Sequence, residues 1–485
     1  MKKTKTKPAK VSKSDKVDKK PTAAPVETNV AAKPKKAFSL IRGMHDILPK
    51  DEKYWKALYR TAEHLAEYFQ FGRIDTPILE EVGLFVRSVG RGTDIVDKEM
   101  YTFEDRDGTK VALRPEPTAS IVRAYIQHGL WNAPQPVKVW TFAPMFRHDR
   151  PQAGRYRQFY QADFETVGGK DPCIDAELIL VAYNFFNDLG LPVEVRVNSL
   201  GTPEERERYI AELVAYYRSK RSYLCEDCRF RLTKNPLRLL DCKEGQCAPV
   251  KEGAPQLIDW LQEDSKNFFM KVLEYLDELG IPYILNPYLV RGLDYYTHTV
   301  FEIFPTFGET GPSATLGTGS QSALGGGGRY DLLAEDLGGR PTPAAGFGIG
   351  IERAVTALKQ YAETNSIKIA NVAPHIFFAE LGEDAKRRAL RIINQLRASG
   401  IRLAYNFMKG SLKNQLEMAN SLKVPYVVIL GQKEVQDETV ILRDMESGVQ
   451  EIIDQKKLEA ALKKKLSNIL AVESAGSQGD EGTVV

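Results

Sequence analysis

Four arginines are crowded into one short stretch of the chain, together with aromatic and amide side chains. The stretch, residues 147–161, has the sequence RHDRPQAGRYRQFYQ. Guanidinium groups match phosphate and carboxylate oxygens in a bidentate manner, so arginines grouped around an aromatic ring can hold a nucleotide. A solvated basic loop explains the stretch equally well, and a second arginine-bearing motif is needed to favour a nucleotide site.

Two glycine-rich stretches further along the chain are candidates for such motifs. Residues 346–353 (GFGIGIER) alternate glycine with bulky apolar residues and place Arg353 in the first turn of an expected helix, and residues 325–333 read GGGGRYDLL. Glycine lets a backbone or a ligand approach closely. Neither stretch has the spacing of a dinucleotide fingerprint or the Lys-Ser or Lys-Thr of a Walker loop. Each stretch alone also fits a helix packed tightly on a sheet.

A β-hairpin must position the arginine stretch. Residues 137–150 and 155–168 are expected to form its two strands. Neighbouring strands joined by hairpins indicate an antiparallel sheet rather than a doubly wound parallel sheet. Alternate residues of a strand share a face, so two arginines lie on the same side as an aromatic ring and an amide. These four residues are Arg155, Arg157, Phe159 and Gln161.

Patterning predicts further elements on both sides of this hairpin. Residues 51–69 place apolar side chains at three- and four-residue spacing, which is typical of an amphipathic helix. Residues 97–116 indicate a second hairpin around Asp107-Gly108, a dipeptide favoured in tight turns. Residues 372–469 alternate strand-like and helical segments, which predicts an α/β domain with a mixed sheet.

The composition is that of an ordinary globular protein. Of 485 residues, 43% are hydrophobic and 27% are charged, and this length suffices for two or three domains. No apolar run approaches the roughly 18–20 residues that span a bilayer, and no signal-peptide core follows the N-terminal lysines. The sequence therefore predicts a soluble protein of the cytoplasm that makes no membrane contact.

Both ends of the chain are expected to be disordered. Residues 1–36 carry twelve lysines against three acidic residues, a net charge of +9, so residues 37–485 carry −6 of the total of +3. This tail lacks aromatic side chains and cannot bury enough surface to offset its chain entropy. A solubilising role, weak attraction to RNA and a transit peptide remain open for it. Residues 470–485 are expected to form a second disordered tail.

Four of the five cysteines lie close together in an expected helical insertion, residues 202–280, which opens with a capping box formed by Thr202 and Glu205. Their spacing is compatible with tetrahedral structural zinc and equally with four reduced thiols. The fifth, the isolated Cys173, is expected to be a buried thiol. The clustered residues are Cys225, Cys228, Cys242 and Cys247.

The motifs taken together and in order resemble those of the histidyl-tRNA synthetases, a family of class II aminoacyl-tRNA synthetases. The resemblance covers about residues 41–469. The arginine hairpin looks like class II motif 2 and GFGIGIER like motif 3, while LVRGLDYYT and GGGGRYD look like the two signature peptides of the family. The motifs in chain order are RGMHDILP, TPILE, LRPEPTAS, FRHDRPQAGRYRQF, LVRGLDYYTHTVFEI, GGGGRYD and GFGIGIER.

The resemblance implies an α+β fold. It places an antiparallel-sheet catalytic domain at residues 37–365, interrupted by the helical insertion at about 202–280. An anticodon-binding domain with a mixed sheet would follow at residues 372–469, with Lys409, Lys413 and Arg443 as candidate RNA contacts. Motif 1, about GRIDTPILEE at residues 72–81, implies a homodimer because it forms subunit contacts in class II enzymes.

The resemblance also implies a reaction. The enzyme would activate L-histidine with ATP and Mg²⁺ and then esterify the terminal adenosine of tRNA(His). Arg147 would hold the histidine carboxylate and the α-phosphate, Arg353 the γ-phosphate, and Arg291 would approach the α-phosphate from the opposite side. The remaining ATP contacts would be Asp149, Arg155 and Phe159. Contacts to the tRNA acceptor end would be Arg150, Gln152 and Arg155.

Selection of histidine would rest on a second set of residues. Glu116, Thr118 and Gln161 would bind the α-amino group, while Glu165, Tyr295 and Tyr296 would bind the imidazole ring. One departure from the family pattern is Pro117 in LRPEPTAS, where the family commonly has glycine, and this proline removes a backbone N–H.

Two other interpretations remain. The regulatory subunit of ATP phosphoribosyltransferase shares the catalytic fold and senses histidine, but such relatives usually lose the phosphate-binding arginines and the C-terminal domain. A different class II synthetase, such as the threonine or proline enzyme, would not explain LVRGLDYYT.

Overall fold

The computed structural model describes residues 38–90, 93–149, 154–307, 323–367, 369, 373–408, 411–467 and 469. The two tails expected to be disordered lie outside the described residues, as do the candidate RNA contacts Arg150, Gln152 and Lys409. No helix in this described part of the chain is long and apolar enough to cross a membrane.

The catalytic part is built on an eight-stranded sheet, which confirms the predicted antiparallel architecture. Strands β5, β6, β11, β10, β9 and β7 are antiparallel neighbours, and only the short edge strands β1 and β8 pair in parallel. The predicted arginine hairpin is the pair β5 and β6. In spatial order the strands are β1 Gly72–Arg73, β5 Val137–Phe146, β6 Gln158–Val167, β11 Ala344–Gly350, β10 Gly325–Arg329, β9 Thr297–Pro305, β7 Val193–Ser199 and β8 Tyr283–Leu285.

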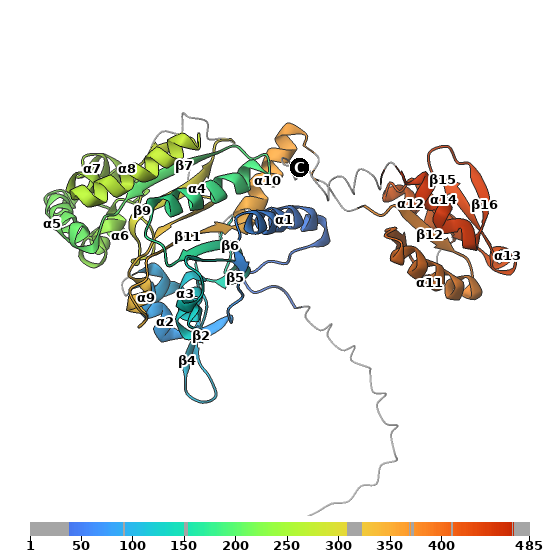
Figure 1. Ribbon diagram of the computed structural model, residues 1–485, viewed down its shortest axis with the longest axis horizontal. Coiled ribbons are helices and arrows are strands. Elements are labelled where there is room, and N and C mark those ends of the chain that lie inside the picture. The colour runs from blue at the N-terminus through green and yellow to red at the C-terminus, as the bar shows by residue number, and fades with distance from the viewer. Residues whose placement is uncertain are drawn as a thin grey trace, which may run out of the picture. The chain divides into compact units, whose positions relative to one another are not determined.

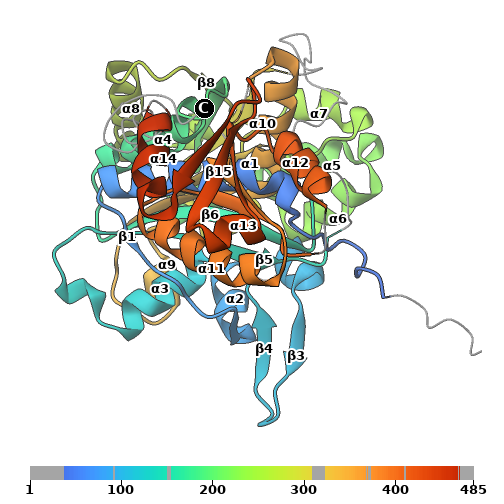
Figure 2. The ribbon, with the colours of Figure 1, turned by 90° about the vertical axis from the view of Figure 1, so that its right-hand side faces the viewer.

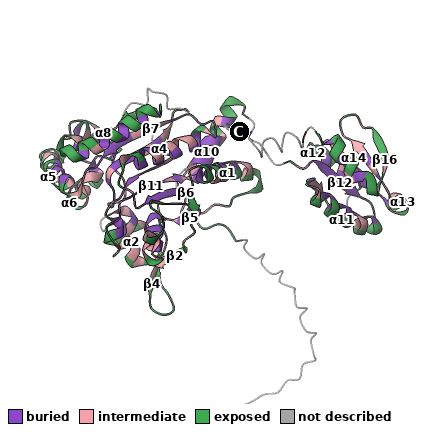
Figure 3. Cartoon of the chain, viewed as in Figure 1, coloured by how far each residue is buried: buried purple, intermediate pink, exposed green. Residues whose placement is uncertain are grey.

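Four helices cover one face of this sheet (Figure 1). Phe164, Phe301 and Phe347 point into this layer and are buried with the apolar sides of the helices. Buried residues, purple in Figure 3, gather where the helices meet the sheet. Because alternate strand residues point the other way, the opposite face is left for polar side chains. The covering helices are α1 Glu52–Tyr68, α4 Pro172–Asn187, α8 Glu263–Glu278 and α10 Ile351–Asn365.

A small sheet and three helices pack beside strand β6. The predicted hairpin around Asp107-Gly108 is present, and Gly108 has the positive φ of 87° that favours glycine. Figure 2 shows strands β3 and β4 extending from the rest of this region. The elements are β2 Leu79–Glu81, β3 Thr102–Glu104, β4 Lys110–Leu113, α2 Val82–Ser88, α3 Thr118–Gln127 and α9 Leu333–Asp336.

The expected insertion is helical and begins with the predicted capping box, in which Thr202 and Glu205 exchange side-chain and backbone hydrogen bonds. Helix α8 is the last helix of the insertion, and it packs against α4 in the core beneath the large sheet. The other helices share a separate apolar cluster with Tyr295 and Tyr296. These helices are α5 Pro203–Ser219, α6 Glu226–Lys234 and α7 Ala248–Glu252.

The C-terminal part has the predicted mixed sheet. Strands β13, β12 and β14 are parallel, and β15 and β16 continue the sheet in antiparallel fashion. Ile376 and Phe378 of β12 pack with α11 and α14, whereas Phe377 and Ala379 pack with α12, so helices cover both faces. The elements are β12 Ile376–Glu380, α11 Glu383–Ala398, β13 Leu403–Tyr405, α12 Leu412–Ser421, β14 Tyr426–Leu430, α13 Gln432–Gln436, β15 Thr439–Asp444, β16 Gln450–Asp454 and α14 Leu458–Lys465.

Candidate active site

A cavity of about 950 Å³ opens on the polar face of the large sheet. Its walls bring together every predicted histidine-binding and ATP-binding residue. Arg147, Arg291 and Arg353 come from three separate segments and share this one space. The other predicted residues in its walls are Glu116, Thr118, Asp149, Arg155, Phe159, Gln161, Glu165, Tyr295 and Tyr296.

The alternating glycines of β11 make room for acidic side chains in the floor of the cavity. Gly346 pairs with Glu165 of β6, and Gly348 pairs with Asp163. A methyl group at Gly346 would overlap the Glu165 carboxylate and lie 2.7 Å from the carbonyl oxygen of Phe164. A methyl group at Gly348 would overlap Asp163. The close approach predicted for these glycines is therefore made by carboxylates of the neighbouring strand.

Several guanidinium groups in the cavity walls, among them those of Arg147 and Arg353, have few acidic partners. Arg147 donates from Nε to the carbonyl of Pro115 at 2.8 Å, and its guanidinium lies 5.2 Å from the centre of the Phe159 ring. Arg353 donates from Nη1 to the carbonyl of Ala323 at 2.9 Å. Burial, and after it the charges of Arg155 and Arg147, lower the pKa of Arg353 to about 10. Such a concentration of positive charge favours a bound anion.

Arg291 enters the cavity from the segment before β9. Its guanidinium forms an ion pair with Glu302 and lies 5.7 Å from the centre of the Tyr296 ring. Although burial disfavours its charge, the Glu302 carboxylate holds the pKa of Arg291 above its ordinary value. Its Nε is buried and has no hydrogen-bond partner among the described residues, so one donor remains for a ligand.

Asp149 and Arg155 face each other across the loop that joins β5 and β6. Their side chains form an ion pair with an N–O distance of 3.1 Å. Both side chains are partly exposed, so this pair contributes little to stability and can rearrange around a ligand.

Buried acids also line the cavity. Glu165 accepts hydrogen bonds from the hydroxyls of Thr118, at 2.7 Å, and Tyr330. Glu116 accepts from the backbone N–H groups of Thr118 at 2.8 Å and Ala119 at 3.0 Å. Burial raises the pKa of Glu165 to about 8, while the two hydroxyl donors oppose the shift. A positively charged or N–H-donating ligand would relieve the cost of ionising these buried acids.

Asp163 adds a third buried acid that the sequence analysis did not include. Its pKa is raised well above the ordinary range by burial and then by the charges of Glu165 and Glu116. One of its carboxylate oxygens has no hydrogen-bond partner among the described residues, and the same holds for the amide oxygen of Gln161. These two acceptors are open to a cationic ligand.

Tyr330 is another site residue that the sequence analysis did not single out. It is buried, donates to Glu165 and lies with its ring centre 5.6 Å from that of Tyr295 in an edge-on arrangement. The signal was present in the GGGGRYD stretch, where Tyr330 directly follows Arg329. The neighbouring residues in the sequence do not reveal that its hydroxyl contacts Glu165, which lies 165 positions earlier in the chain.

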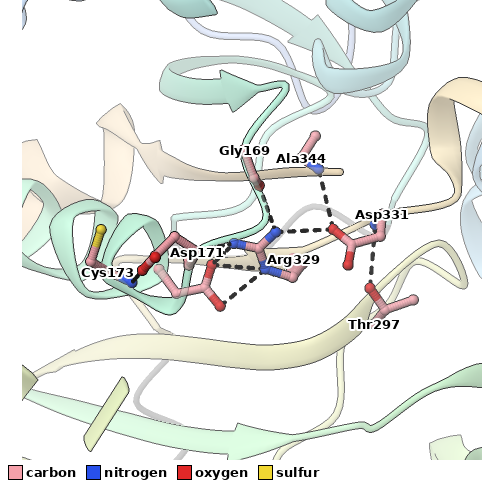
Figure 4. A network of polar contacts seen from close by, with 8 residues as sticks. Gly169, Asp171, Cys173, Thr297, Arg329, Asp331 and Ala344 are labelled. Carbon is pink, nitrogen blue, oxygen red and sulfur yellow. Dashed lines mark hydrogen bonds and ion pairs between the residues drawn. The ribbon is translucent and has the colours of Figure 1, made fainter. Parts of the chain in front are cut away.

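A buried ion-pair network fixes the backbone beside Tyr330. Arg329 is fully buried and donates to Asp175 of α4 at 2.6 Å, to Asp331 at 3.1 Å and to the carbonyl of Gly169 at 2.9 Å. Figure 4 shows its guanidinium between Gly169 and Asp331, with dashed lines to both. Breaking one side of such a buried pair typically costs about 3–5 kcal/mol, because the remaining charge is left without a partner. The network therefore positions Tyr330 without touching the cavity.

Pro117 does not disturb the site. It has a φ of −95° and directly precedes α3, where an N–H would have no partner within the helix. The N–H groups that hold Glu116 belong to the next two residues, Thr118 and Ala119. The missing N–H of the proline thus leaves the anchoring of Glu116 intact.

The expectation for Cys173 was wrong, because this cysteine is exposed. It lies in the first turn of α4, where its backbone N–H donates to the capping side chain of Asp171 at 2.9 Å. Ile174 and Asp175 of the same turn are buried, so Cys173 lies on the exposed side of the helix, and its residue type alone did not imply burial.

Replacing Glu165 by glutamine should stabilise the ligand-free chain, increasingly so as the pH rises from 4.5 to about 8. The pKa of Glu165 rises from 4.5 to about 8 on folding. Within this window the unfolded chain has already lost a proton that the folded chain retains, so stability of the native protein falls with increasing pH. Glutamine has no such proton. Thermal unfolding across the window tests this, and a melting-temperature difference that does not grow with pH would contradict the buried-acid interpretation.

Two family models match the chain. The tRNA synthetase class II core domain (G, H, P, S and T) matches residues 101–361, and the anticodon binding domain matches residues 352–465. The first match spans more than half of the chain and contains the arginine hairpin and both glycine-rich stretches.

Comparison with individual proteins identifies the family of this chain more specifically. The histidine–tRNA ligase of Dehalococcoides mccartyi is 45% identical over 426 residues, which cover 88% of this chain and 99% of the relative. That of Natranaerobius thermophilus is 42% identical over 424 residues, covering 87% and 98%. The crystal structure of apo S. aureus histidyl-tRNA synthetase superposes with a TM-score of 0.70 at 33% identity, covering 88% of this chain and all of that one. The chain belongs to the histidine–tRNA ligases, within the class II aminoacyl-tRNA synthetases.

Proposed function

We propose that this chain activates L-histidine with ATP and transfers the histidyl group to tRNA(His). The observation that carries the proposal is that Arg147, Arg291 and Arg353 share one cavity with the buried acids Glu116, Asp163 and Glu165. A polyanion and a cationic amino acid fit such a cavity side by side.

In the first step, a histidine carboxylate oxygen attacks the α-phosphorus of ATP. The bond from phosphorus to the bridging oxygen of the β-phosphate breaks, and pyrophosphate leaves. Arg147 holds the carboxylate and the α-phosphate, Arg291 the other side of the α-phosphate, and Arg353 the γ-phosphate. Positioning and charge stabilisation of this kind account for most of the rate enhancement in phosphoryl-type transfers.

The adenine end of ATP would lie on the arginine hairpin. Phe159 offers its ring for stacking, and Asp149 and Arg155 contact the base and the phosphates after their ion pair opens. The 3.1 Å pair lies at the cavity wall and is partly exposed, so exchanging it for ligand contacts costs little.

In this proposal, the buried acids Glu116 and Glu165 and their neighbours select histidine. Glu116, Thr118 and the free amide oxygen of Gln161 take the α-ammonium group. Glu165 accepts from an imidazole N–H, and Tyr295 and Tyr296 enclose the ring. An amino acid without these donors leaves buried acceptors unpaired, which is the strongest basis for rejecting a substrate.

Mg²⁺ accompanies ATP in this proposal. The carboxylates of Glu302 and Glu352 line the cavity and offer the oxygen ligands that Mg²⁺ prefers. When bound, the ion neutralises charge on the leaving pyrophosphate.

In the second step, a ribose hydroxyl of the terminal adenosine attacks the carbonyl carbon of the histidyl-adenylate, and AMP leaves. Arg150, Gln152 and Arg155 of the hairpin loop are proposed to meet the acceptor end. In the C-terminal part, Lys413 is exposed and Arg443 is half-buried, and both are proposed to contact the anticodon arm together with Lys409.

We also propose that the enzyme acts as a homodimer in the cytoplasm. Several apolar side chains in and near motif 1 are exposed in the single chain, as expected for a covered surface. A monomeric mass in sedimentation equilibrium would contradict the dimer. The exposed residues are Ile78, Leu79 and Phe103.

ATP–pyrophosphate exchange with each of the twenty amino acids tests the proposed reaction. We expect exchange with histidine only. Exchange with no amino acid would favour a histidine-sensing regulatory subunit, and exchange with another amino acid would favour a different class II synthetase. Either outcome would overturn the proposal.

A further inference from the structure

The four clustered cysteines converge on a single point in the insertion. Their sulfur atoms all lie within 4.8 Å of one another, and Cys225 Sγ and Cys242 Sγ are 3.9 Å apart. A disulfide would require about 2.05 Å. The four side chains are therefore separate thiols that meet without bonding to each other.

These distances are those of a tetrahedral metal site. A zinc–sulfur bond of about 2.3 Å in a regular tetrahedron places neighbouring sulfurs about 3.8 Å apart. An iron–sulfur cluster would have to fit several iron and sulfide ions between its thiolates, and sulfurs within 4.8 Å of one another leave no room for them. Hard cations such as Mg²⁺ and Ca²⁺ prefer oxygen ligands, which this cluster does not offer.

The backbone around the cluster is arranged to support negatively charged sulfur. The N–H of Cys225 donates to Cys247 Sγ at 3.2 Å, and the N–H of Cys228 donates to Cys225 Sγ at 3.4 Å. Cys225 also occupies the capping position of α6, whose N-terminus favours a negative charge. Cys228, Cys242 and Cys247 are buried, so their sulfurs are shielded from solvent.

The two short helices beside the cluster bury few apolar side chains, and the rest of the segment packs into the apolar cluster shared with α5. Helix α6 buries only Cys228 and Leu232, and α7 buries only Val250. Small units of this kind are commonly stabilised by a metal or by disulfides, and all five cysteines are free.

We propose that Cys225, Cys228, Cys242 and Cys247 bind one structural zinc ion. The ion closes the chain segment between the second and third ligands, which carries Asn235 and Arg238 to the cavity. Asn235 Nδ2 donates to Asp294 Oδ1 at 3.1 Å, and Arg238 lies against Gly292. The two contacted residues lie one and three positions after Arg291. Zinc thereby supports the wall of the active site and takes no part in the reaction.

Elemental analysis of the purified full-length chain tests the site. We expect about one zinc ion per chain in the wild type and in Cys173→Ser, the matched control outside the cluster, and loss of most of it in Cys228→Ser. Folded wild-type chain that retains less than about a tenth of an ion after incubation with zinc would overturn the proposal.

Two further measurements use only the wild-type chain and so do not depend on whether a cysteine variant folds. Cobalt(II) added after chelation should give sulfur-to-metal charge-transfer bands and the absorption of a tetrahedral ion, and a spectrum without sulfur bands would refute the four-thiolate site. Limited trypsin digestion should cut residues 225–247 in the chelated chain and spare them after zinc is restored. Identical digestion would refute the structural role. None of these readouts involves histidine or ATP, so failure here is distinguishable from failure of the proposed reaction.

Discussion

Replacing Arg291 by alanine should lower histidine-dependent ATP–pyrophosphate exchange by at least about tenfold, equivalent to roughly 1.4 kcal/mol of activation free energy. Arg291 lines the same cavity as Arg147 and Arg353, and its Nε has no partner among the described residues. It is positioned to stabilise charge that develops on the α-phosphate. Steady-state exchange at saturating histidine and ATP measures the effect.

Two controls separate this role from a general loss of stability. Alanine at position 291 leaves Glu302 buried without its partner, so thermal unfolding must first establish that Arg291→Ala is folded at the assay temperature. Arg388→Ala removes a partly buried arginine of the C-terminal part that is paired with Glu438 at 3.9 Å and does not line the cavity. Unchanged exchange in Arg291→Ala, or an equal loss in Arg388→Ala, would refute the assigned role.

Gly346→Ala should reduce the catalytic efficiency for histidine by about a hundredfold, since displacement of a positioned group by about 1 Å has effects of this size. The added methyl group would overlap the carboxylate of Glu165 and lie 2.7 Å from a backbone carbonyl. Glu165 cannot move freely, because Thr118 and Tyr330 both donate to it. The imidazole pocket must therefore distort.

The matched substitution is Gly83→Ala in α2, where an added methyl group meets no atom within 4 Å. This variant should retain wild-type exchange. Circular dichroism and thermal unfolding establish that Gly346→Ala is folded before its kinetics are compared. Wild-type efficiency for histidine in a folded Gly346→Ala chain would contradict the proposed packing of β11 against the pocket.

The pattern of neighbouring residues was sufficient to predict the secondary-structure elements that carry the arginines. The β5–β6 hairpin follows from the alternation of side chains and the loop between them, and α10 follows from the periodicity after GFGIG. The glycines at 346 and 348 were predicted to allow close approach, and the structure identifies what approaches them. The placement of Arg353 in the first turn of a helix is also confirmed.

Contacts between segments that are far apart in the sequence could not be predicted from the pattern of neighbouring residues. Tyr330, which follows β10, donates to Glu165 of β6 although strand β11 lies between these two strands. Arg329 pairs with Asp175 of α4, which covers the face of the sheet opposite the cavity. Such pairings depend on strand order, which residue spacing does not encode. The prediction for Cys173 was wrong for a related reason, because its exposure depends on which side of α4 faces the core.

A crystal structure of the full chain with ATP and histidinol, which lacks the reactive carboxylate, tests the central claim most directly. The account predicts that Arg147, Arg291 and Arg353 contact the triphosphate and that the imidazole lies between Glu165 and the tyrosines. In the ligand-free chain these arginines bind the Pro115 carbonyl, Glu302 and the Ala323 carbonyl. A nucleotide bound elsewhere, with all three arginines still on those partners, would contradict the account.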